Sequence, residues 1–345
     1  MKLDEFDYEL PKELIAQLPS QKRENSKMLV LNRQALCFED KHFYDIVDCL
    51  DENDFLVLNN TKVIPARLFS VKDTGAKIEI FLVREIEKTV WIALIKPSKR
   101  VKPDMVLTIG EKLSVKILEK IDDKWKIKLN YEGNIFEILG EYGNIPLPPY
   151  IERNMTDAQY KSLDFERYQT VYAKHEGSVA APTAGLHFTE DILKKLEQKG
   201  VGKAFVHLNV GLGTFKPVKA ENIEEHKMDS ESFEIPEESA NAINNAVEQG
   251  KNIVAVGTTS VRTLETTMQK YGKILPVKDS SELFIYPGFE FKIVNKIITN
   301  FHLPKSTLLM LVSAFAGKNF IFDAYKHAIN SNYRFYSYGD CMFIK

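Results

Sequence analysis

Apolar and polar positions alternate in several short runs between residues 77 and 130. Ile78 and Ile80 are two positions apart, as are Trp91 and Ala93, and glycines or an Asp-Asp pair separate one run from the next. Runs that recur about every ten residues are typical of an antiparallel unit of about five or six strands, small enough to close into a barrel. The prolines of IPLPPY cannot continue a central strand, and they end this region.

Helical and strand patterns follow one another in the rest of the chain. TEDILKKLEQKG has Thr189 as a predicted N-cap and stops at Gly200, while IPEESANAINNAVEQG starts at Pro236 and ends before Gly250. GKAFVHLNVG and KNIVAVG fit strands. Strands that alternate with helices indicate a largely parallel sheet covered on both faces.

The sequence therefore predicts an α/β protein with an insertion. We expect a larger mixed α/β domain, with a largely parallel sheet, from residues 1–66 and 150–345, and an inserted small antiparallel β-barrel domain from residues 67–149. Residues 55–58 form an apolar run in the first part of the chain. We expect this run to be a strand of the main sheet.

Composition narrows the class of protein. The chain is 44% hydrophobic, which suits a sizeable core, and its three cysteines show no CxxC pair, which favours reduced thiols in the cytoplasm. The first residues have no basic, apolar signal pattern, and no run of about 20 apolar residues predicts a membrane span. Because the net charge is −2, a nucleic-acid partner would need a local basic patch.

The uncharged segment GSVAAPTAGLHFT, residues 177–189, is the first candidate site. Small residues that lead into a helix N-terminus expose backbone N–H groups to a polar ligand, and Gly185 permits close approach. Ser178 and Thr183 supply hydroxyl groups, and His187 can transfer a proton near neutral pH. A tight structural turn with a packed histidine explains the same residues equally well.

HLNVGLGTFKPV is the second candidate. His207 lies on a predicted strand, and Gly211, Gly213 and Thr214 follow it, where α/β proteins open their ligand crevice. A GxG pair without a third glycine is weak evidence for a dinucleotide site, and the chain has no GxxxxGK[ST] motif. The structural alternative is a bulge.

VGTTSVRTLE repeats the arrangement of buried strand, glycine, hydroxyl residues and helix. Thr258, Thr259 and Ser260 are candidate ligand contacts at the turn. Arg262 and Glu265 are three positions apart on the predicted helix, so they are either site residues or an ordinary ion pair in solvent.

Two further segments close the list of candidates. In TNFHLPKST, His302 and Lys305 precede an apolar helix and could face a crevice. In YRFYSYGDCMFI, Arg334, Tyr336 and Asp340 combine aromatic rings with an arginine, a combination that can stack bases. A C-terminal edge strand is the simpler interpretation of the second segment.

A basic cluster is a candidate contact for nucleic acid, and the spacing of the histidines indicates whether a metal could bind. Lys99, Arg100 and Lys102 lie in the predicted barrel and could contact phosphates, although a solvated loop also explains them. The seven histidines contain no HxH or HxxxH pair, so we expect no metal.

Taken together, these segments resemble the S-adenosylmethionine:tRNA ribosyltransferase-isomerase family of the queuosine pathway. The resemblance covers nearly the whole chain in order, and GSVAAPTAGLHFT with GLGTFKPV is its most specific part. It implies transfer and isomerisation of the ribosyl part of S-adenosylmethionine onto 7-aminomethyl-7-deazaguanine at the tRNA wobble position, giving epoxyqueuosine, adenine and methionine. It also implies no metal and no cofactor apart from the consumed co-substrate.

This reaction needs groups that move protons beside a sulfonium. We choose His187 first and His207 second for proton transfer, with Glu265 as a further catalytic candidate. The other candidates named above are expected to bind the co-substrate or the tRNA. Few fixed cations should lie near the sulfonium, because like charges repel strongly in a pocket of low dielectric constant. We expect the protein to act as a monomer in the cytoplasm.

Two alternatives belong to other classes. An S-adenosylmethionine-dependent RNA methyltransferase is disfavoured because LVLNNTKVIPARL lacks the glycine-rich first loop. A non-catalytic RNA-binding protein would use the barrel and the tyrosine-rich segment. The products separate the three, since methyl transfer leaves S-adenosylhomocysteine, ribosyl transfer leaves adenine and methionine, and a binding protein leaves the co-substrate intact.

Overall fold

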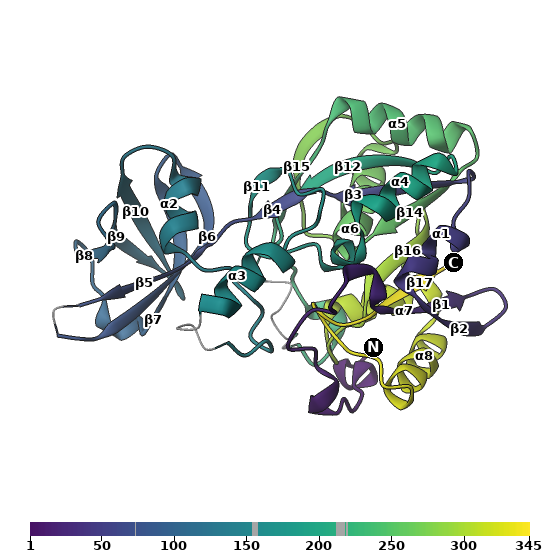
Figure 1. The fold of residues 1–345 in the computed structure, drawn as a ribbon, viewed down its shortest axis with the longest axis horizontal. Coiled ribbons are helices and arrows are strands. Elements are labelled where there is room, and N and C mark those ends of the chain that lie inside the picture. The colour runs from purple at the N-terminus through teal and green to yellow at the C-terminus, as the bar shows by residue number, and fades with distance from the viewer. Residues whose placement is uncertain (73, 154–157, 212–217, 219) are drawn as a thin grey trace.

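A nine-stranded mixed sheet forms the larger part of the molecule (Figure 1). The computed structural model describes residues 1–72, 74–153, 158–211, 218 and 220–345. The strand order in the sheet is β15-β13-β12-β3-β14-β16-β17-β1-β2. The strands of this sheet are β1 (Lys27–Asn32), β2 (Cys37–His42), β3 (Asp54–Asn59), β12 (Gly202–Leu208), β13 (Glu231–Ile235), β14 (Asn252–Val256), β15 (Val277–Ser281), β16 (Val294–Asn300) and β17 (Cys341–Ile344).

The four central strands β12, β3, β14 and β16 are parallel to one another. The predicted strand at residues 55–58 is therefore confirmed as part of the main sheet. β17 lies between β16 and β1 and is fully buried, so the expectation of an edge strand there is wrong. Its neighbours bury both of its sides, which suits the apolar run Cys341–Ile344.

Helices cover both faces of this sheet, as the alternation predicted. Ile253 and Ala255 of β14 join a core cluster with residues of four helices, whereas Val254 and Val256 pack against helices on the opposite face. The first face carries α5 (Glu237–Glu248), α6 (Thr258–Tyr271), α7 (Thr307–Ala316) and α8 (Lys318–Asn330), and the second carries α1 (Ile46–Cys49) and α4 (Glu190–Gln198).

The helix boundaries follow local chemistry. Thr189 caps α4 by accepting a hydrogen bond from the backbone N–H of Ile192, and Gly200 adopts a φ of 83° just beyond its end. Pro236 occupies the N-cap of α5 and Gly250 follows its C-terminus. Both helices match the sequence prediction.

A six-stranded antiparallel sheet stands apart from the larger one (Figure 1). Its order is β5-β6-β7-β10-β9-β8, and the Ser70 hydroxyl of β5 donates to the Thr108 carbonyl of β8 at 2.8 Å, which nearly closes the barrel. The strands are β5 (Arg67–Val71), β6 (Lys77–Glu87), β7 (Val90–Lys96), β8 (Val106–Ile109), β9 (Leu113–Ile121) and β10 (Lys124–Tyr131).

One part of the barrel prediction is wrong. Alternation does not continue to residue 149, because α2 (Ile135–Tyr142) is a helix. Asn134 caps it, and Ile138 and Leu139 pack into the barrel core. Between the barrel and the main sheet lie α3 (Ala158–Arg167) and a parallel pair of strands, β4 (Thr61–Val63) and β11 (His175–Ser178).

Across the described ranges, no single helix is both long and apolar enough to cross a membrane. The pair α7 and α8 would meet the same criterion only when joined, and the two helices bend by 114° at their junction.

Candidate functional site

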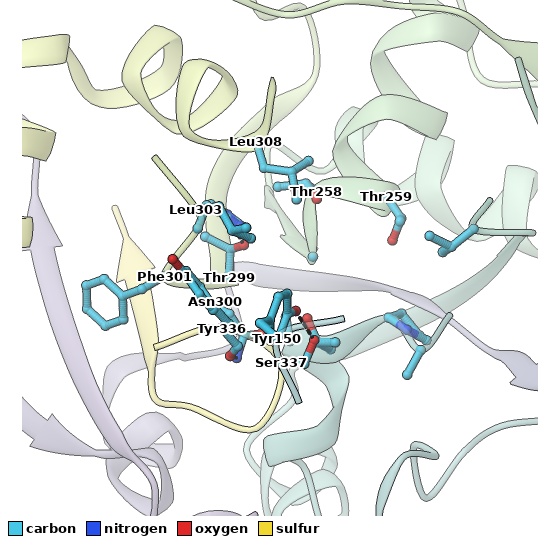
Figure 2. A pocket seen from close by; sticks show the side chains of 17 residues that line it. Tyr150, Thr258, Thr259, Thr299, Asn300, Phe301, Leu303, Leu308, Tyr336 and Ser337 are labelled. Carbon is cyan, nitrogen blue, oxygen red and sulfur yellow. Dashed lines mark hydrogen bonds between the residues drawn. The ribbon is translucent and has the colours of Figure 1, made fainter. Parts of the chain in front are cut away.

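A pocket opens at the carboxyl ends of the parallel strands (Figure 2). The space between its atoms is about 570 Å³ with the open mouth included, and the centre of a water-sized sphere can occupy about 50 Å³ of it. Residues 181–184, 257–259 and 299–303 line it, together with Tyr150, Val210, Leu308, Tyr336 and Ser337. Parts of all five segments singled out in the α/β region therefore meet in one place.

The N-terminus of α6 points its free backbone donors at this pocket. Gly257, the N-cap, has a φ of 87° and has no side chain to cap the first turn. Thr258 and Thr259 line the pocket, and among the described residues Thr259 Oγ1 has no hydrogen-bond partner although the residue is only 9% exposed. The loop that leads into α4 is not the anion-binding helix start, because Thr189 already caps α4.

The described lining of the pocket contains no Asp, Glu, Lys or Arg. Its only titratable groups of note are His302 and two tyrosines. Burial lowers the pKa of His302 to about 3, so the ring is neutral at physiological pH, and its Nε2 lies 3.0 Å from Thr299 Oγ1. Tyr150 and Tyr336 pack against each other with ring centroids 4.7 Å apart. The pocket is thus polar but uncharged.

The uncharged segment 177–189 is anchored through Ser178. Its hydroxyl donates to the Ala180 carbonyl at 2.7 Å and accepts from the Val210 backbone N–H at 3.1 Å. This contact brings the segment beside the residues that follow β12. Thr183 lines the pocket, whereas Gly185 does not. A Cβ at Gly185 would lie 2.1 Å from the Tyr172 hydroxyl, so packing requires a glycine there.

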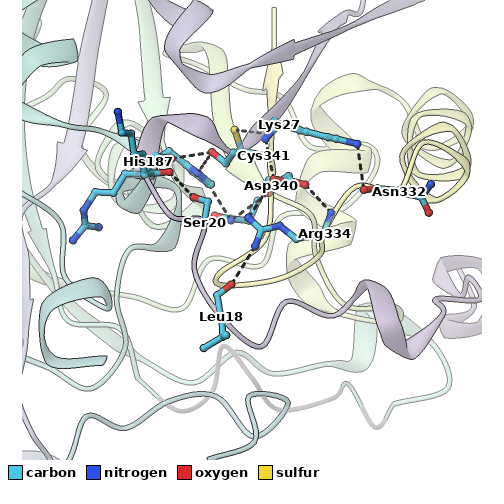
Figure 3. Close-up of polar contacts among 12 residues, drawn as sticks. Leu18, Ser20, Lys27, His187, Asn332, Arg334, Asp340 and Cys341 are labelled. Atoms are coloured by element: carbon cyan, nitrogen blue, oxygen red, sulfur yellow. Dashed lines mark hydrogen bonds and ion pairs between the residues drawn. The ribbon is translucent and has the colours of Figure 1, made fainter. Parts of the chain in front are cut away.

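His187 does not line this pocket but contacts Asn300, which does. Figure 3 shows its polar surroundings. It is 4% exposed, its Nδ1 is 2.7 Å from Ser26 Oγ, and its Nε2 is 3.2 Å from the side-chain amide of Asn300. The carbonyls of Tyr336 and Asp340, 3.1 and 3.4 Å away, identify this amide atom as the nitrogen Nδ2, which can only donate; its two hydrogens are shared among three acceptors, of which His187 Nε2 is one. Burial, then the charges of Arg334 and Arg23, lower the pKa of His187 to about 3.

His207 is half-buried on β12 and does not line the pocket. Its Nδ1 contacts Asn60 Oδ1, and its ring stacks on His175 with centroids 3.8 Å apart. Burial and the neighbouring His175 lower the pKa of His207 to about 4. Gly211 donates its N–H to Glu231 at 3.0 Å, while Gly213 and Thr214 lie outside the described residues.

Arg262 and Glu265 do not pair in solvent, and that expectation is wrong. Both are buried, and Arg262 forms an ion pair with Glu231 and donates to the carbonyls of Leu283 and Ser281. The Glu265 carboxylate accepts the backbone N–H groups of residues 292, 293 and 294 at 2.8–3.2 Å. Ser260 bonds the Val256 carbonyl behind it. These side chains fasten α6 to its surroundings and do not line the pocket.

Three candidates from the last two segments also have structural partners. Lys305 pairs with Asp4 and Asp7 at 2.7 and 3.0 Å. Asp340 is 2% exposed and accepts the backbone N–H groups of Lys27 and Arg334 at 2.9 and 2.7 Å. Burial raises the pKa of Asp340, and its carboxylate lies 3.7 Å from the Arg334 guanidinium (Figure 3).

The basic residues of the barrel lie on its surface. Lys99, Arg100 and Lys102 are all exposed at and after the turn that follows β7. None of them lines a pocket described here.

Sequence reasoning missed Asn300, Tyr150, Ser26 and two arginines, Arg23 and Arg167. Asn300 ends a buried strand directly before the highlighted FHLPK, and a polar residue at a strand's carboxyl end is the signal that could have found it. The others lie on irregular or helical segments whose approach to the site depends on tertiary structure.

An α/β sheet joined to an antiparallel barrel agrees with the comparisons. A family model described as "Queuosine biosynthesis protein" matches residues 3–344, and the chain belongs to this family. The family resemblance inferred from sequence is confirmed, and so is the predicted fold class.

Curated relatives carry a more specific name. The chain is 49% identical to the S-adenosylmethionine:tRNA ribosyltransferase-isomerase of Staphylococcus saprophyticus and 52% identical to that of Sulfurihydrogenibium, with complete coverage of both chains. A crystal structure of S-adenosylmethionine tRNA ribosyltransferase from Thermotoga maritima is 38% identical, with a TM-score of 0.56 over 99% of this chain and 100% of that one.

In the part of the chain that the structure describes, no group of three or more His, Cys, Asp or Glu side chains is placed to hold a metal ion. The expectation of metal-free chemistry remains a prediction.

Proposed function

We propose that this protein transfers and isomerises the ribosyl moiety of S-adenosylmethionine onto 7-aminomethyl-7-deazaguanine at the wobble position of tRNA. The products are epoxyqueuosine-tRNA, adenine and methionine. Membership of the queuosine biosynthesis family and full-length identity of about half to the named ribosyltransferase-isomerases support this reaction. The protein acts on tRNA in the cytoplasm, as a monomer, and S-adenosylmethionine is a consumed co-substrate.

The uncharged pocket at the end of the parallel strands is the proposed co-substrate site. The single observation that carries the assignment is the absence of charged side chains among its described lining residues. S-adenosylmethionine carries a sulfonium, which a fixed cation would repel in a desolvated pocket and which an adjacent carboxylate would pair with too stably to react easily. The hydroxyl oxygens of Thr183, Thr258 and Thr299 give the sulfonium polar surroundings without a charge.

The N-terminus of α6 is the proposed place for the carboxylate of the co-substrate. That carboxylate is the only anion of the molecule, and a helix N-terminus attracts anions through its free N–H groups and its dipole. The unpartnered hydroxyl of Thr259 supplies one more donor at the same point. The aromatic rings of Tyr150 and Tyr336 offer apolar surface for a base.

The reaction begins with loss of a proton from the carbon next to the sulfonium. The ylide so formed opens the ribose and expels adenine, the tRNA amine adds, and epoxide closure expels methionine. His187 is the first choice for the proton transfer, because it is neutral and its Nε2 lone pair faces Asn300, which lines the pocket. His207 is the second choice. Glu265 is proposed as a positioning residue, since three backbone amides occupy its carboxylate.

Mass spectrometry of the products tests the function. Wild-type protein incubated with S-adenosylmethionine and tRNA bearing 7-aminomethyl-7-deazaguanine should give epoxyqueuosine-tRNA with equal amounts of adenine and methionine. S-adenosylhomocysteine would indicate a methyltransferase instead. Intact co-substrate with retained tRNA binding would indicate a binding protein.

A further inference from the structure

A second, smaller pocket adjoins the first; the space between its atoms is about 250 Å³ with its open side included, and the centre of a water-sized sphere can occupy about 20 Å³ of it. Ser20, Arg23, Arg167 and His187 line it, and Ser337 lines both pockets. His187 also contacts Asn300 of the first pocket. The second pocket is therefore adjacent to the proposed reaction site and differs from it in charge.

The two arginines of this pocket make hydrogen bonds only to carbonyl groups. Arg23 donates to the carbonyls of residues 166, 167 and 186 at 3.0–3.4 Å, and Arg167 donates to those of Ser20 and Gln21 at 2.7 and 3.3 Å. A guanidinium has five N–H donors, so both retain donors for a ligand. Arg167 Nε in particular has no partner within the described chain.

Neither arginine forms an ion pair with any residue that the structure describes, and in this they resemble the partly buried Arg33, which also donates only to carbonyls. Two other arginines with buried side chains are paired. Arg153 pairs with Asp164 at 2.8 Å on the same helix as Arg167, and Arg262 pairs with Glu231. Two partly buried cations that line one pocket repel each other and favour an anion between them. Burial and then the nearby Arg167 lower the pKa of Arg23, and the charge of Glu166 opposes this shift.

We propose that this second pocket binds a backbone phosphate of the substrate RNA, next to the nucleotide whose base enters the first pocket. Arginine forks match phosphate oxygens in geometry and charge, and phosphate contacts orient a nucleic acid without reading its sequence. The shared Ser337 places the two pockets side by side, as a base turned out of its loop and its own phosphate require. This inference rests on the proposed function, because it takes tRNA as the substrate.

The alternative to phosphate binding is that the two arginines have only a structural role. Arg23 and Arg167 tie the segment around Ser20 to α3, and in that role their charge would be incidental. Charge and hydrogen bonding must therefore be separated in the test. Arg167 is the better position, because Arg23 makes more of the structural bonds.

The experiment compares Arg167→Gln, Arg167→Lys and the control Arg84→Gln, which removes one exposed charge from β6 of the barrel. Kd for tRNA is measured against salt concentration, with KM for S-adenosylmethionine and melting temperature alongside. Arg167→Gln should weaken tRNA binding roughly tenfold and lower the salt slope by about 0.7–0.9, the value of one phosphate contact. Arg167→Lys should keep most of the slope, and Arg84→Gln and the KM for S-adenosylmethionine should change little.

A second measurement locates the phosphate. Anticodon hairpins carrying one uncharged methylphosphonate on either side of the target nucleotide should bind wild type more weakly at one position, and Arg167→Gln should show no additional loss there. Additive losses at both positions, an unchanged salt slope, or a rise only in the KM for S-adenosylmethionine would overturn the proposal. Salt-sensitive tRNA binding without product formation would instead contradict the proposed function and leave the phosphate site standing.

Discussion

The side-chain amide of Asn300 lies between His187 and the pocket, donating to His187 Nε2 at 3.2 Å. The amide oxygen, Oδ1, is buried without a partner in the described structure. Asn300 thus holds the histidine in one tautomer, with its proton on Nδ1 toward Ser26, and presents an unused acceptor. The Nε2 lone pair on the pocket side is therefore occupied by the Asn300 amide, and His187 can accept a proton there only when this amide turns away.

Replacement of His187 by alanine is predicted to lower kcat by about 10²–10⁴, the usual contribution of a general acid–base group. The Kd for tRNA should change far less than kcat, because His187 lines the second pocket as a neutral ring. Melting temperature should also fall, because Ser26 and Asn300 lose a buried partner and Phe43 loses a packed ring. Turnover is therefore measured well below the melting transition of the variant. If kcat at that temperature were near normal in both His187→Ala and His207→Ala, proton transfer would be assigned to His302 instead.

Acid should destabilise the protein through its buried histidines. The folded-state pKa of His187 is about 3 and the ordinary value is 6.5, so between these values the unfolded chain binds the extra proton. The free energy of unfolding then decreases as pH falls below 6.5, by about 1.4 kcal/mol per pH unit for this group. Urea titrations at pH 7, 6 and 5 should show the gap between wild type and His187→Gln narrowing by about 0.7 kcal/mol in the first step and about 1.2 kcal/mol in the second. A gap that stays constant with pH would refute the shift.

Thr259→Val tests the α6 end of the pocket. Loss of the hydroxyl should raise KM for S-adenosylmethionine by roughly 10- to 150-fold, the value of one hydrogen bond to a charged group. Melting temperature should not fall, because the hydroxyl has no partner in the described structure. Thr263→Val is the matched control, since Thr263 has a similarly unpartnered hydroxyl on the same helix but does not line the pocket. An equal KM in Thr259→Val and wild type would place the carboxylate elsewhere.

Neutralising the barrel cluster should weaken tRNA binding. Lys99, Arg100 and Lys102 are exposed together, and glutamine at all three positions should flatten the salt dependence of Kd by about 0.9 for each lost phosphate contact. Filter-binding titrations between 50 and 200 mM salt, about the range over which such contacts are most visible, measure this. Melting temperature serves as the control, and an unchanged slope would place the tRNA contacts elsewhere.

The strands and most helices followed from local patterns, whereas long-range pairing did not. Alternation around Ile78 and Ile80 suffices to predict a barrel strand, because side-chain period alone fixes which residues face the core. The residues of α2 were mistaken for strand although Ile135, Ile138, Leu139 and Tyr142 follow the helical spacing i, i+3, i+4, i+7 and Asn134 precedes them as an N-cap. β17 was expected at an edge, since no local signal reveals that β1 and β16 enclose it. The boundaries at residues 66 and 150 stay a prediction.

In the candidate site, too, local features could be predicted from the sequence and features that depend on tertiary packing could not. The segments that line the pocket carried local signals, namely a glycine or a hydroxyl at the end of a strand, and they were found. The direction of each side chain depends on packing, so Glu265 and Arg262 resembled site residues although they bond the surrounding backbone. The catalytic and binding roles themselves remain predictions.

The pairing of β1 with β17 also bears on how the chain is made. Lys27 and Asp340 are hydrogen-bonded across 313 positions of sequence, whereas the barrel strands between residues 67 and 131 pair with near neighbours. During synthesis the barrel has all its partners early, and β1 must wait for almost the entire chain. During that interval one edge of β1 is unpaired and apolar, which is the kind of surface that chaperones bind. Slow translation should therefore increase misfolding of the larger sheet and leave folding of the barrel unchanged.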